Sequence, residues 1–307
     1  MALNTGNILQ QKNRGKLHGV GLGFRREMLP TLKENALTDI DFFELSPENW
    51  LGLGGRYARD LRHFTEQYPF VCHGLSLSIG GTAELDTQLL RNIKAFMKHH
   101  GISLYTEHLS WCADDGHLYD LLPIPCTDEA VHWVSKRIKQ AQDILEMPIG
   151  LENASYYFSP PGSQMREEEF INAIIEESNC MLHLDVNNVY VNSQNFGFDA
   201  HDYLAALPLD KVCYLHVAGH YVEPDGFIVD THGADVIDPV WALLEHTYSQ
   251  LDNPSAIATC LERDFNFPAF DQLQHELRTI KKLQQNAELA RQHQRKKPPF
   301  NITHTGK

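Results

Sequence analysis

Short apolar runs alternate with longer amphipathic segments along most of this chain. The runs have the length of β-strands, and the segments between them have the length and periodicity of α-helices. A strand followed by a helix and then another strand is typical of a parallel sheet, because parallel neighbours need a crossover connection. Eight such units predict an α/β fold of the closed (β/α)8 TIM-barrel type, with a doubly wound open sheet as the alternative.

The bounds of these elements follow from the apolar runs and from local capping signals. Asp86 and Asp128 stand at expected helix N-caps, and Gly101 stands just after an expected helix end. The expected strands are 19–22, 42–45, 70–77, 103–109, 149–152, 181–186, 212–217 and 256–261. The expected helices are 30–37, 57–68, 86–100, 128–145, 166–178, 200–207, 239–250 and 269–286.

The length of the chain, 307 residues, suits one barrel with additions, since such barrels have roughly 250 residues. We expect residues 1–18 to form an N-terminal extension and residues 19–291 to form a metal-binding barrel domain. The basic, proline-containing segment 292–307 is expected to be a flexible tail. Residues 156–164 and 218–236 are expected to be loops at the barrel mouth, where long loops are usually functional.

Composition argues against several classes of protein. The formal net charge of -14 disfavours non-specific binding to nucleic acid, which depends on neutralising phosphates. Apolar runs long enough to cross a membrane are absent from the sequence, and the polar N-terminus lacks the apolar core of a secretory signal. The six cysteines are scattered without metal-binding spacing, which is typical of reduced thiols. We therefore expect a cytoplasmic protein without disulfides that binds neither membrane nor nucleic acid.

Histidine, aspartate and glutamate recur where nearly every expected strand ends. In a TIM barrel the carboxyl ends of all strands meet at one face, where active sites are built. Side chains that are far apart in the sequence are therefore expected to share one pocket. These side chains are His73, Glu107, His108, Glu152, His183, Asp185, His216, Asp230, His232 and Glu262, with His220 on the following loop.

This set of residues predicts a metal site with more than one ion. Many buried ionisable groups packed together without a cation would be costly in desolvation and repulsion. Asp230 and His232 are two positions apart, so both point the same way from an extended segment. Mixed imidazole and carboxylate shells suit iron, zinc, manganese or cobalt better than calcium or magnesium. A single histidine or glutamate of this set could instead serve only as a hydrogen-bonded structural group.

An ordered series of motifs then resembles one family. The motifs are GVGLGFR, FFELSPENW, HGLSLSIGG, TEHLSW, LENASYY, HLDVNN, HVAGH, DTHG and LERD, spread over residues 19–264. Together they resemble the multinuclear non-haem iron-dependent oxidative enzymes (MNIO). That resemblance implies a xylose-isomerase-like TIM barrel, a superfamily that also contains endonuclease IV.

The resemblance also implies roles for individual residues. The metal positions that match are His73, His108, Glu152, Asp185, His216, Asp230, His232 and Glu262. Endonuclease IV has a histidine three residues after the aspartate of the sixth strand, whereas this chain has Asn188, which we also take as a metal position. This difference favours an oxidase over a trizinc hydrolase. Glu107 and His183 are expected to orient ligands, and His220 to be a ligand or a proton carrier.

The activity implied by the resemblance is the oxidation of a ribosomally made precursor peptide, commonly at cysteine. It would use two or three iron ions in mixed ferrous and ferric states, O₂ as co-substrate, and a small companion protein that delivers the peptide. Two alternatives remain open from the residues themselves. One is a sugar isomerase or phosphodiester hydrolase of the same superfamily with zinc or manganese, and the other is a metal-loaded scaffold that only binds a peptide or partner.

Overall fold

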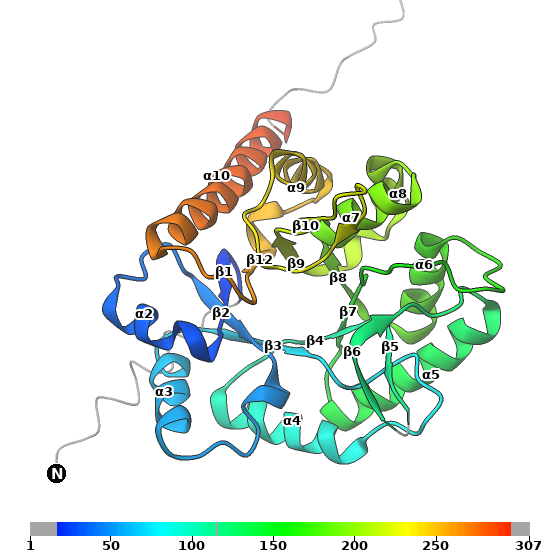
Figure 1. Ribbon diagram of the computed structural model, residues 1–307, viewed down its shortest axis with the longest axis horizontal. Helices are drawn as coiled ribbons and strands as arrows, with labels where there is room; N and C mark the ends of the chain where they lie inside the picture. Colours follow the sequence, from blue (N-terminus) through cyan, green and yellow to red (C-terminus); the bar gives the residue numbers. More distant parts are fainter. Residues whose placement is uncertain (1–16, 115, 296–307) are drawn as a thin grey trace, which may run out of the picture.

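A computed structural model describes residues 17–114 and 116–295 of the chain. Eight parallel strands form a closed barrel in the order β1-β12-β9-β8-β7-β4-β3-β2, with the helices around it (Figure 1). The TIM barrel predicted from the sequence is confirmed, and the open-sheet alternative is wrong. Each barrel strand overlaps one of the expected strands. Their bounds are β1 Val20–Gly23, β2 Phe42–Leu45, β3 Phe70–Gly74, β4 Tyr105–His108, β7 Gly150–Glu152, β8 Met181–Asp185, β9 Val212–Ala218 and β12 Ala258–Glu262.

The helices follow the strands as the amphipathic pattern predicts. Asp86 caps α4 as expected, by accepting from the backbone N–H groups of Gln88 and Leu89. Helix α5 is capped by Thr127, whose side chain accepts from the N–H of Ala130, whereas the expected N-cap, Asp128, is the first residue of the helix. The α-helices are α2 Leu29–Glu34, α3 Gly55–Thr65, α4 Thr87–His100, α5 Asp128–Leu145, α6 Glu167–Ser178, α7 Val186–Phe196, α8 Ala200–Ala206, α9 Asp238–Gln250 and α10 Phe270–Arg295. Short 3-10 turns are η1 Arg26–Met28, η2 Pro47–Asn49, η3 Leu209–Lys211 and η4 Pro254–Ala256.

Helix α7 was not predicted from the sequence. Its valines and asparagines are weak helix formers, so no amphipathic pattern marked the segment. The helix begins directly after β8, where the Asp185 side chain accepts a hydrogen bond from the N–H of Asn188. Both faces of its first two turns are buried, and tertiary packing therefore outweighs its low propensity.

Other differences lie in the loops and at the end of the chain. Two antiparallel hairpins were not expected, namely β5 Trp111–Ala113 with β6 His117–Leu122, and β10 Tyr221–Val222 with β11 Ile228–Val229. The second hairpin lies within the expected long loop 218–236. Helix α10 continues to Arg295, so the first residues assigned to the tail are helical. The rest of the expected tail, and residues 1–16 of the expected extension, lie outside the described residues.

Period-two alternation divides the barrel interior into two layers. In β2, Phe42 and Glu44 face inward while Phe43 and Leu45 pack against the surrounding helices, where the main hydrophobic core lies. The lower layer of the interior is apolar, with Phe42, Val71, Leu104, Tyr214, Ala258 and Cys260 in contact. The next inward position on each of several strands is ionisable, and this places a polar layer directly above an apolar one.

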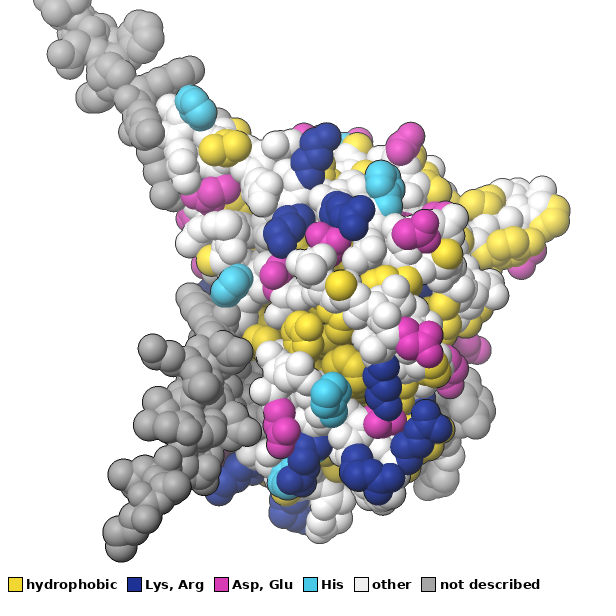
Figure 2. All heavy atoms as spheres, turned by 90° about the vertical axis from the view of Figure 1, so that its left-hand side faces the viewer, with side chains coloured by type: hydrophobic (Ala, Val, Ile, Leu, Met, Phe, Trp, Pro, Cys, Tyr) yellow, Lys and Arg dark blue, Asp and Glu magenta, His cyan; other side chains and the backbone are white. Residues whose placement is uncertain are grey.

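The face of the molecule formed by α2, α3 and α10 carries charges of both signs. Acidic and basic side chains are interspersed on the side where α2, α3 and α10 lie, without a field of one sign (Figure 2). Among the described residues, no helix is both long enough and apolar enough to cross a membrane. The six cysteines are free thiols, and Cys72, Cys112, Cys180 and Cys260 are buried.

Candidate metal centre

The polar layer of the barrel brings together the ligand residues predicted from the sequence. The strands β3, β4, β7, β8, β9 and β12 each end on at least one of them. His183, Asp185 and His216 are fully buried, and Glu152 is 2% exposed. Ligand atoms of these side chains converge in three adjoining groups.

The first group joins β3, β4 and β7. The Nε2 atoms of His73 and His108 lie 3.1 Å apart. Both also lie close to Oε2 of Glu152, at 3.1 Å and 3.2 Å respectively. Three ligand atoms from three strands therefore face one point.

The Nδ1 atoms of both imidazoles, which point away from Glu152, make contacts that orient the rings. Nδ1 of His108 lies 3.0 Å from the carbonyl oxygen of Gly74, which can only accept, so Nδ1 carries the hydrogen. Nε2 of His108 then faces Glu152 and would offer its lone pair to a bound cation. Nδ1 of His73 contacts the hydroxyl of Thr106 at 2.8 Å. Such outer contacts orient metal-binding imidazoles in proteins.

The second group is centred on His216 of β9. Its Nδ1 lies 3.2 Å from Oε1 of Glu152 and 3.1 Å from Oε2 of Glu262. Oδ2 of Asp185 lies 3.8 Å from the same nitrogen. Glu152 thus uses one oxygen toward the first group and the other toward the second.

The third group lies at the mouth and includes His232, which has a left-handed backbone conformation with φ of 52°. Nε2 of His232 lies 2.8 Å from Oδ1 of Asp230, and Nδ1 lies 3.4 Å from Oε2 of Glu262. Ligand atoms of Asp185, His232 and Glu262 all lie within 4.8 Å of one another. Glu262 therefore contacts both the second and the third group through Oε2, whereas Glu152 uses a different oxygen for each of its two groups.

Several buried ligand atoms in these groups lack hydrogen-bond partners, as expected of atoms that bind metal ions. Buried atoms without a hydrogen-bond partner include Glu152 Oε2, Asp185 Oδ2, His216 Nδ1 and His232 Nε2. Buried polar atoms in proteins are nearly always paired, and unpaired ones carry a large desolvation cost. These atoms lie close together yet lack hydrogen-bond geometry, and bound cations between them would satisfy all of them.

Two further predicted residues border the groups. Neither ring nitrogen of His183 has a hydrogen-bond partner, and its Nε2 lies 3.8 Å from Oε1 of Glu152. Asn188, on the first turn of α7, donates from Nδ2 to the carbonyl of Asn153 at 3.0 Å. Its Oδ1 is buried without a partner and is available as an amide-oxygen ligand. Both residues have the free atoms that a metal ligand needs.

Glu107 and His220 lie at the edge of the groups. Glu107 accepts hydrogen bonds from the hydroxyl of Tyr105 at 2.7 Å and from the backbone N–H of His108 at 3.2 Å. His220 is 5% exposed and stacks on Tyr190, so it does not lie on an exposed loop. Glu107 therefore holds the segment that carries His108, and His220 reaches the centre only through another residue.

That intermediate residue is Asn187, which was not predicted from the sequence. Its Oδ1 lies 2.7 Å from Nδ1 of His220, and its Nδ2 donates to Oδ1 of Asp230 at 2.8 Å. An amide oxygen only accepts, so the hydrogen of His220 is on Nδ1 and Nε2 is left as a buried, unpaired acceptor. The motif HLDVNN contained this residue, but the spacing from Asp185 pointed to Asn188 instead.

Glu44 and Arg25 were also missed. Oε2 of Glu44 lies 2.6 Å from Nε2 of His216, on the side opposite the ligand groups. Arg25 contacts Oε1 of Glu262 at 3.1 Å and pairs with Asp264. Glu44 is two positions after Phe42 and therefore faces the barrel interior as Phe42 does. A charged residue at an inward strand position needs a buried partner, so the sequence did contain a signal for Glu44.

The charges in the centre shift one another strongly. Burial, together with the charge of Glu152, raises the pKa of Asp185 to about 8. Burial alone would lower the pKa of His108, but the charges of Glu152 and Glu107 outweigh it and raise that pKa to about 9. Burial opposes ionisation of Glu152 as well, yet His183, His73 and His108 hold its pKa well below the ordinary value. Buried carboxylates and imidazoles thus shift the pKa values of one another in this layer.

Comparison with known proteins extends these observations. The chain is 58% identical over 269 residues to a UPF0276 protein of Nitrosospira multiformis, covering 88% of this chain and 94% of that protein. It is 53% identical over 276 residues to a UPF0276 protein of Alcanivorax borkumensis, covering 87% and 91%. A UPF0276 protein of Pseudomonas aeruginosa is 51% identical over 270 residues, covering 88% and 93%.

Solved structures share the fold at low sequence identity. An L-ribulose 3-epimerase superposes with a TM-score of 0.61 at 14% identity, covering 92% of this chain and 100% of that chain. Endonuclease IV from Thermus thermophilus superposes with a TM-score of 0.56 at 15% identity, covering 87% and 99%. A xylose isomerase-like TIM barrel protein from Mycobacterium smegmatis superposes with a TM-score of 0.54 at 11% identity, covering 90% and 99%. The fold is therefore the xylose-isomerase-like TIM barrel.

A sequence profile of the family described as RiPP precursor modification enzymes MbnB/TglH/ChrH matches residues 19–285. RiPPs are ribosomally synthesised and post-translationally modified peptides. The matched range contains every barrel strand and all the ligand groups described above. By this match and by its relatives, the chain belongs to the MbnB/TglH/ChrH family of RiPP precursor modification enzymes.

Proposed function

We propose that this protein is an O₂-dependent oxidase that uses two or three iron ions to modify a ribosomal precursor peptide, at a cysteine of that peptide. The observation that carries the proposal is the continuous series of three ligand groups. They share Glu152 and Glu262 and leave several buried ligand atoms unpaired. The family supplies the substrate class, a precursor peptide.

The donor set supports iron in mixed oxidation states. Imidazole and carboxylate ligands with open positions are typical of non-haem iron enzymes, where the metal supplies one-electron chemistry with O₂. Glu152 and Glu262 each contact two of the ligand groups. Carboxylates in such positions suit metal ions that lie close to one another. Zinc or manganese could occupy the same donors and would indicate a hydrolase or isomerase instead.

The chain's own residues would have separate tasks. We assign metal binding to His73, His108, Glu152, Asp185, Asn188, His216, Asp230, His232 and Glu262. Glu107 would hold His108 in place, and His183 would present its unpaired nitrogens beside Glu152. His220 would hold or move a proton at Nε2, since this atom is free and Asn187 links the ring to Asp230.

The surroundings of the enzyme are part of the same proposal. We place the catalytic unit in residues 19–291, with the ends of the chain outside it, and we place the protein in the cytoplasm. A small companion protein would present the precursor peptide to the barrel mouth. A substrate thiolate, the form of cysteine that binds metals, would then reach the ligand groups from that side.

Elemental analysis of protein purified without oxygen and without added metal tests the proposal, followed by Mössbauer spectroscopy. We expect two or three irons per chain and a magnetically coupled ferrous–ferric signal. We also expect O₂ uptake and a mass change when a cysteine-containing peptide encoded nearby is supplied with its companion protein. Zinc or manganese alone at full occupancy, with activity that needs no O₂, would overturn the oxidase assignment.

A further inference from the structure

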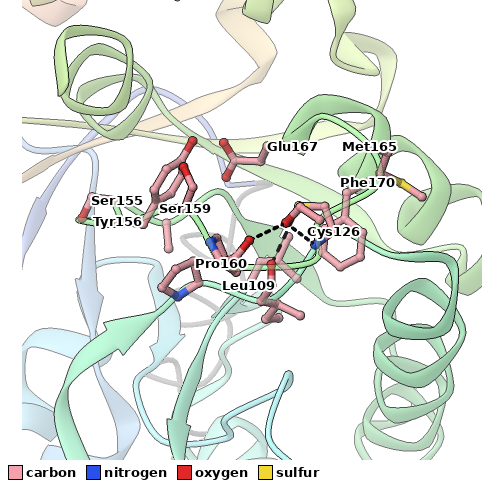
Figure 3. Close-up of a pocket in the computed structure, with 13 residues that line it drawn as sticks. Leu109, Cys126, Ser155, Tyr156, Ser159, Pro160, Met165, Glu167 and Phe170 are labelled. Carbon is pink, nitrogen blue, oxygen red and sulfur yellow. Dashed lines mark hydrogen bonds between the residues drawn. The ribbon is translucent and has the colours of Figure 1, made fainter. Parts of the chain in front are cut away.

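A cavity opens beside the metal centre, between the loop that follows β7 and the start of α6. It has a volume of about 160 Å³. Its walls include Leu109, Ile124, Met165 and Phe170, with Ser155, Tyr156 and Glu167 among the polar lining residues (Figure 3). None of the metal-binding residues assigned above lines this cavity. It is therefore a separate site, although its walls are continuous with the centre.

Two lining residues show that continuity. Leu109 directly follows His108, and its backbone N–H donates to the carbonyl of Glu152 at 2.9 Å. Ser155 donates from Oγ to Oδ2 of Asp230 at 3.0 Å. A chain in extended conformation advances about 3.3 Å per residue. A peptide with one side chain at the metal groups would therefore place a side chain only a few positions away in this cavity.

The size and chemistry of the cavity indicate what it takes. An apolar cavity of about 150 Å³ in a protein is large enough to hold benzene. The exposed lining here is mostly apolar, and burial raises the pKa of its thiol, Cys126. The carboxyl group of Glu167 stands at one wall, and burial raises its pKa to about 7. An acidic side chain would lose its hydration in this largely apolar cavity and is therefore disfavoured. An uncharged side chain of roughly the size of leucine or phenylalanine fits these walls.

We propose that this cavity binds an apolar side chain of the precursor peptide, a few positions from the modified residue, and so sets the sequence that the enzyme accepts. The inference rests on the proposed function, because it assumes a peptide substrate. It goes further by naming the class of residue that the substrate must carry. When a pocket buries an apolar side chain, one methylene more or less in that side chain typically changes the enzyme's preference between substrates by about tenfold or more.

The first test uses indole as a probe of the cavity, independently of any peptide. The chain has six methionines, so labelling their methyl groups with ¹³C gives a simple NMR spectrum of the full-length, metal-loaded protein. Titration with indole should shift the signal of Met165, which lines the cavity, and should leave that of Met147 unchanged. Met147 is a matched reference because it is also half-buried against the main core but lies before β7, away from the cavity. No shift at Met165 would overturn the inference.

The second test asks whether the occupant is a peptide side chain. Short blocked peptides with a central cysteine would carry Ala, Leu, Phe, Trp or Glu at each flanking position in turn, and binding would be measured without O₂. We expect one position at which Leu or Phe binds about tenfold or more tightly than Ala or Glu. Met165→Ala should move the preference at that position toward Trp, because it enlarges the cavity. Met147→Ala should leave the order unchanged.

The outcomes separate this inference from the proposed function. Two results would overturn the cavity assignment and leave the oxidase intact. One is peptides that bind and become oxidised without any side-chain preference. The other is an order of peptide affinities that Met165→Ala does not change. A protein that contains iron and binds indole but binds none of the peptides would contradict the assignment of the cavity to a peptide. A protein without iron would instead defeat the proposed function.

Discussion

Oε2 of Glu44 lies 2.6 Å from Nε2 of His216, while Nδ1 of the same ring faces Glu152 and Glu262. A carboxylate accepts, so Nε2 carries the hydrogen, and Nδ1 is the atom that would offer a lone pair to a metal ion. Glu44 is therefore a positioning residue for the central imidazole. It also adds negative charge behind that imidazole, which strengthens the ring as a ligand.

Replacing Glu44 should weaken metal binding without abolishing the fold. In Glu44→Gln the amide keeps the shape but loses the charge, so we expect metal affinity to fall by about 10–100-fold. Competition with a chelator, followed by elemental analysis, measures this change. Glu276→Gln is the matched control, because Glu276 is equally a buried carboxylate but pairs with Arg263 outside the centre. Equal affinity in wild type and Glu44→Gln would contradict the role.

Glu152→Ala should remove more than one metal ion per chain. Its Oε2 faces His73 and His108, whereas its Oε1 faces His216, so one substitution affects two groups. His108→Ala should affect only the first group. Metal content per chain, measured by mass spectrometry on protein loaded identically, should therefore fall further in Glu152→Ala. The same loss in both variants would show that the two oxygens do not serve separate ions.

Asn187→Ala should separate His220 from Asp230. Asp230 keeps its contact with Ser155, so we expect the metal to remain bound but with an affinity about 10–100-fold lower. Asn192→Ala is the control on the same helix, because Asn192 is also buried and donates to the carbonyl of Ala154, not to a ligand. If both variants lose affinity equally, the effect belongs to α7 as a whole, and the link through Asn187 is unimportant.

His100, at the end of α4, should make stability depend on pH. Burial, with the charges of His99 and Arg62, lowers the pKa of His100 to about 4 in the folded protein. An unfolded histidine titrates near 6.5, so the folded state binds fewer protons between about pH 4 and 6.5. The free energy of unfolding should therefore rise with pH across this window and be lowest below it.

Chemical denaturation at several pH values measures this slope. In His100→Gln the part of the slope due to this group should disappear, because the titrating ring is gone while a polar side chain remains near Thr65. His275→Gln, at an exposed position on α10, should leave the slope as in wild type. A slope that persists unchanged in His100→Gln would assign the pH dependence to other groups.

The sequence by itself determined the barrel and located most of the side chains that meet in its polar layer. Strand and helix periods are local properties, and the alternation of apolar runs such as 181–186 with amphipathic segments left few topologies open. The ends of parallel strands must meet at one face, so the positions of residues such as His73 and Glu262 at strand ends are enough to assign them to one site. The ordered motifs then indicated the family, which the profile match confirmed.

Only the tertiary structure decided how those ligands are used. Glu44 is 172 residues from His216 in the sequence, and nothing local relates the two. The separate directions of the two oxygens of Glu152 depend on side-chain torsions that packing fixes. Helix α7 and the cavity walled by Leu109 and Phe170 likewise arise from contacts between distant segments. Periodicity specifies which face a residue occupies, whereas partners and cavities depend on long-range packing, which the sequence encodes only through the complete fold.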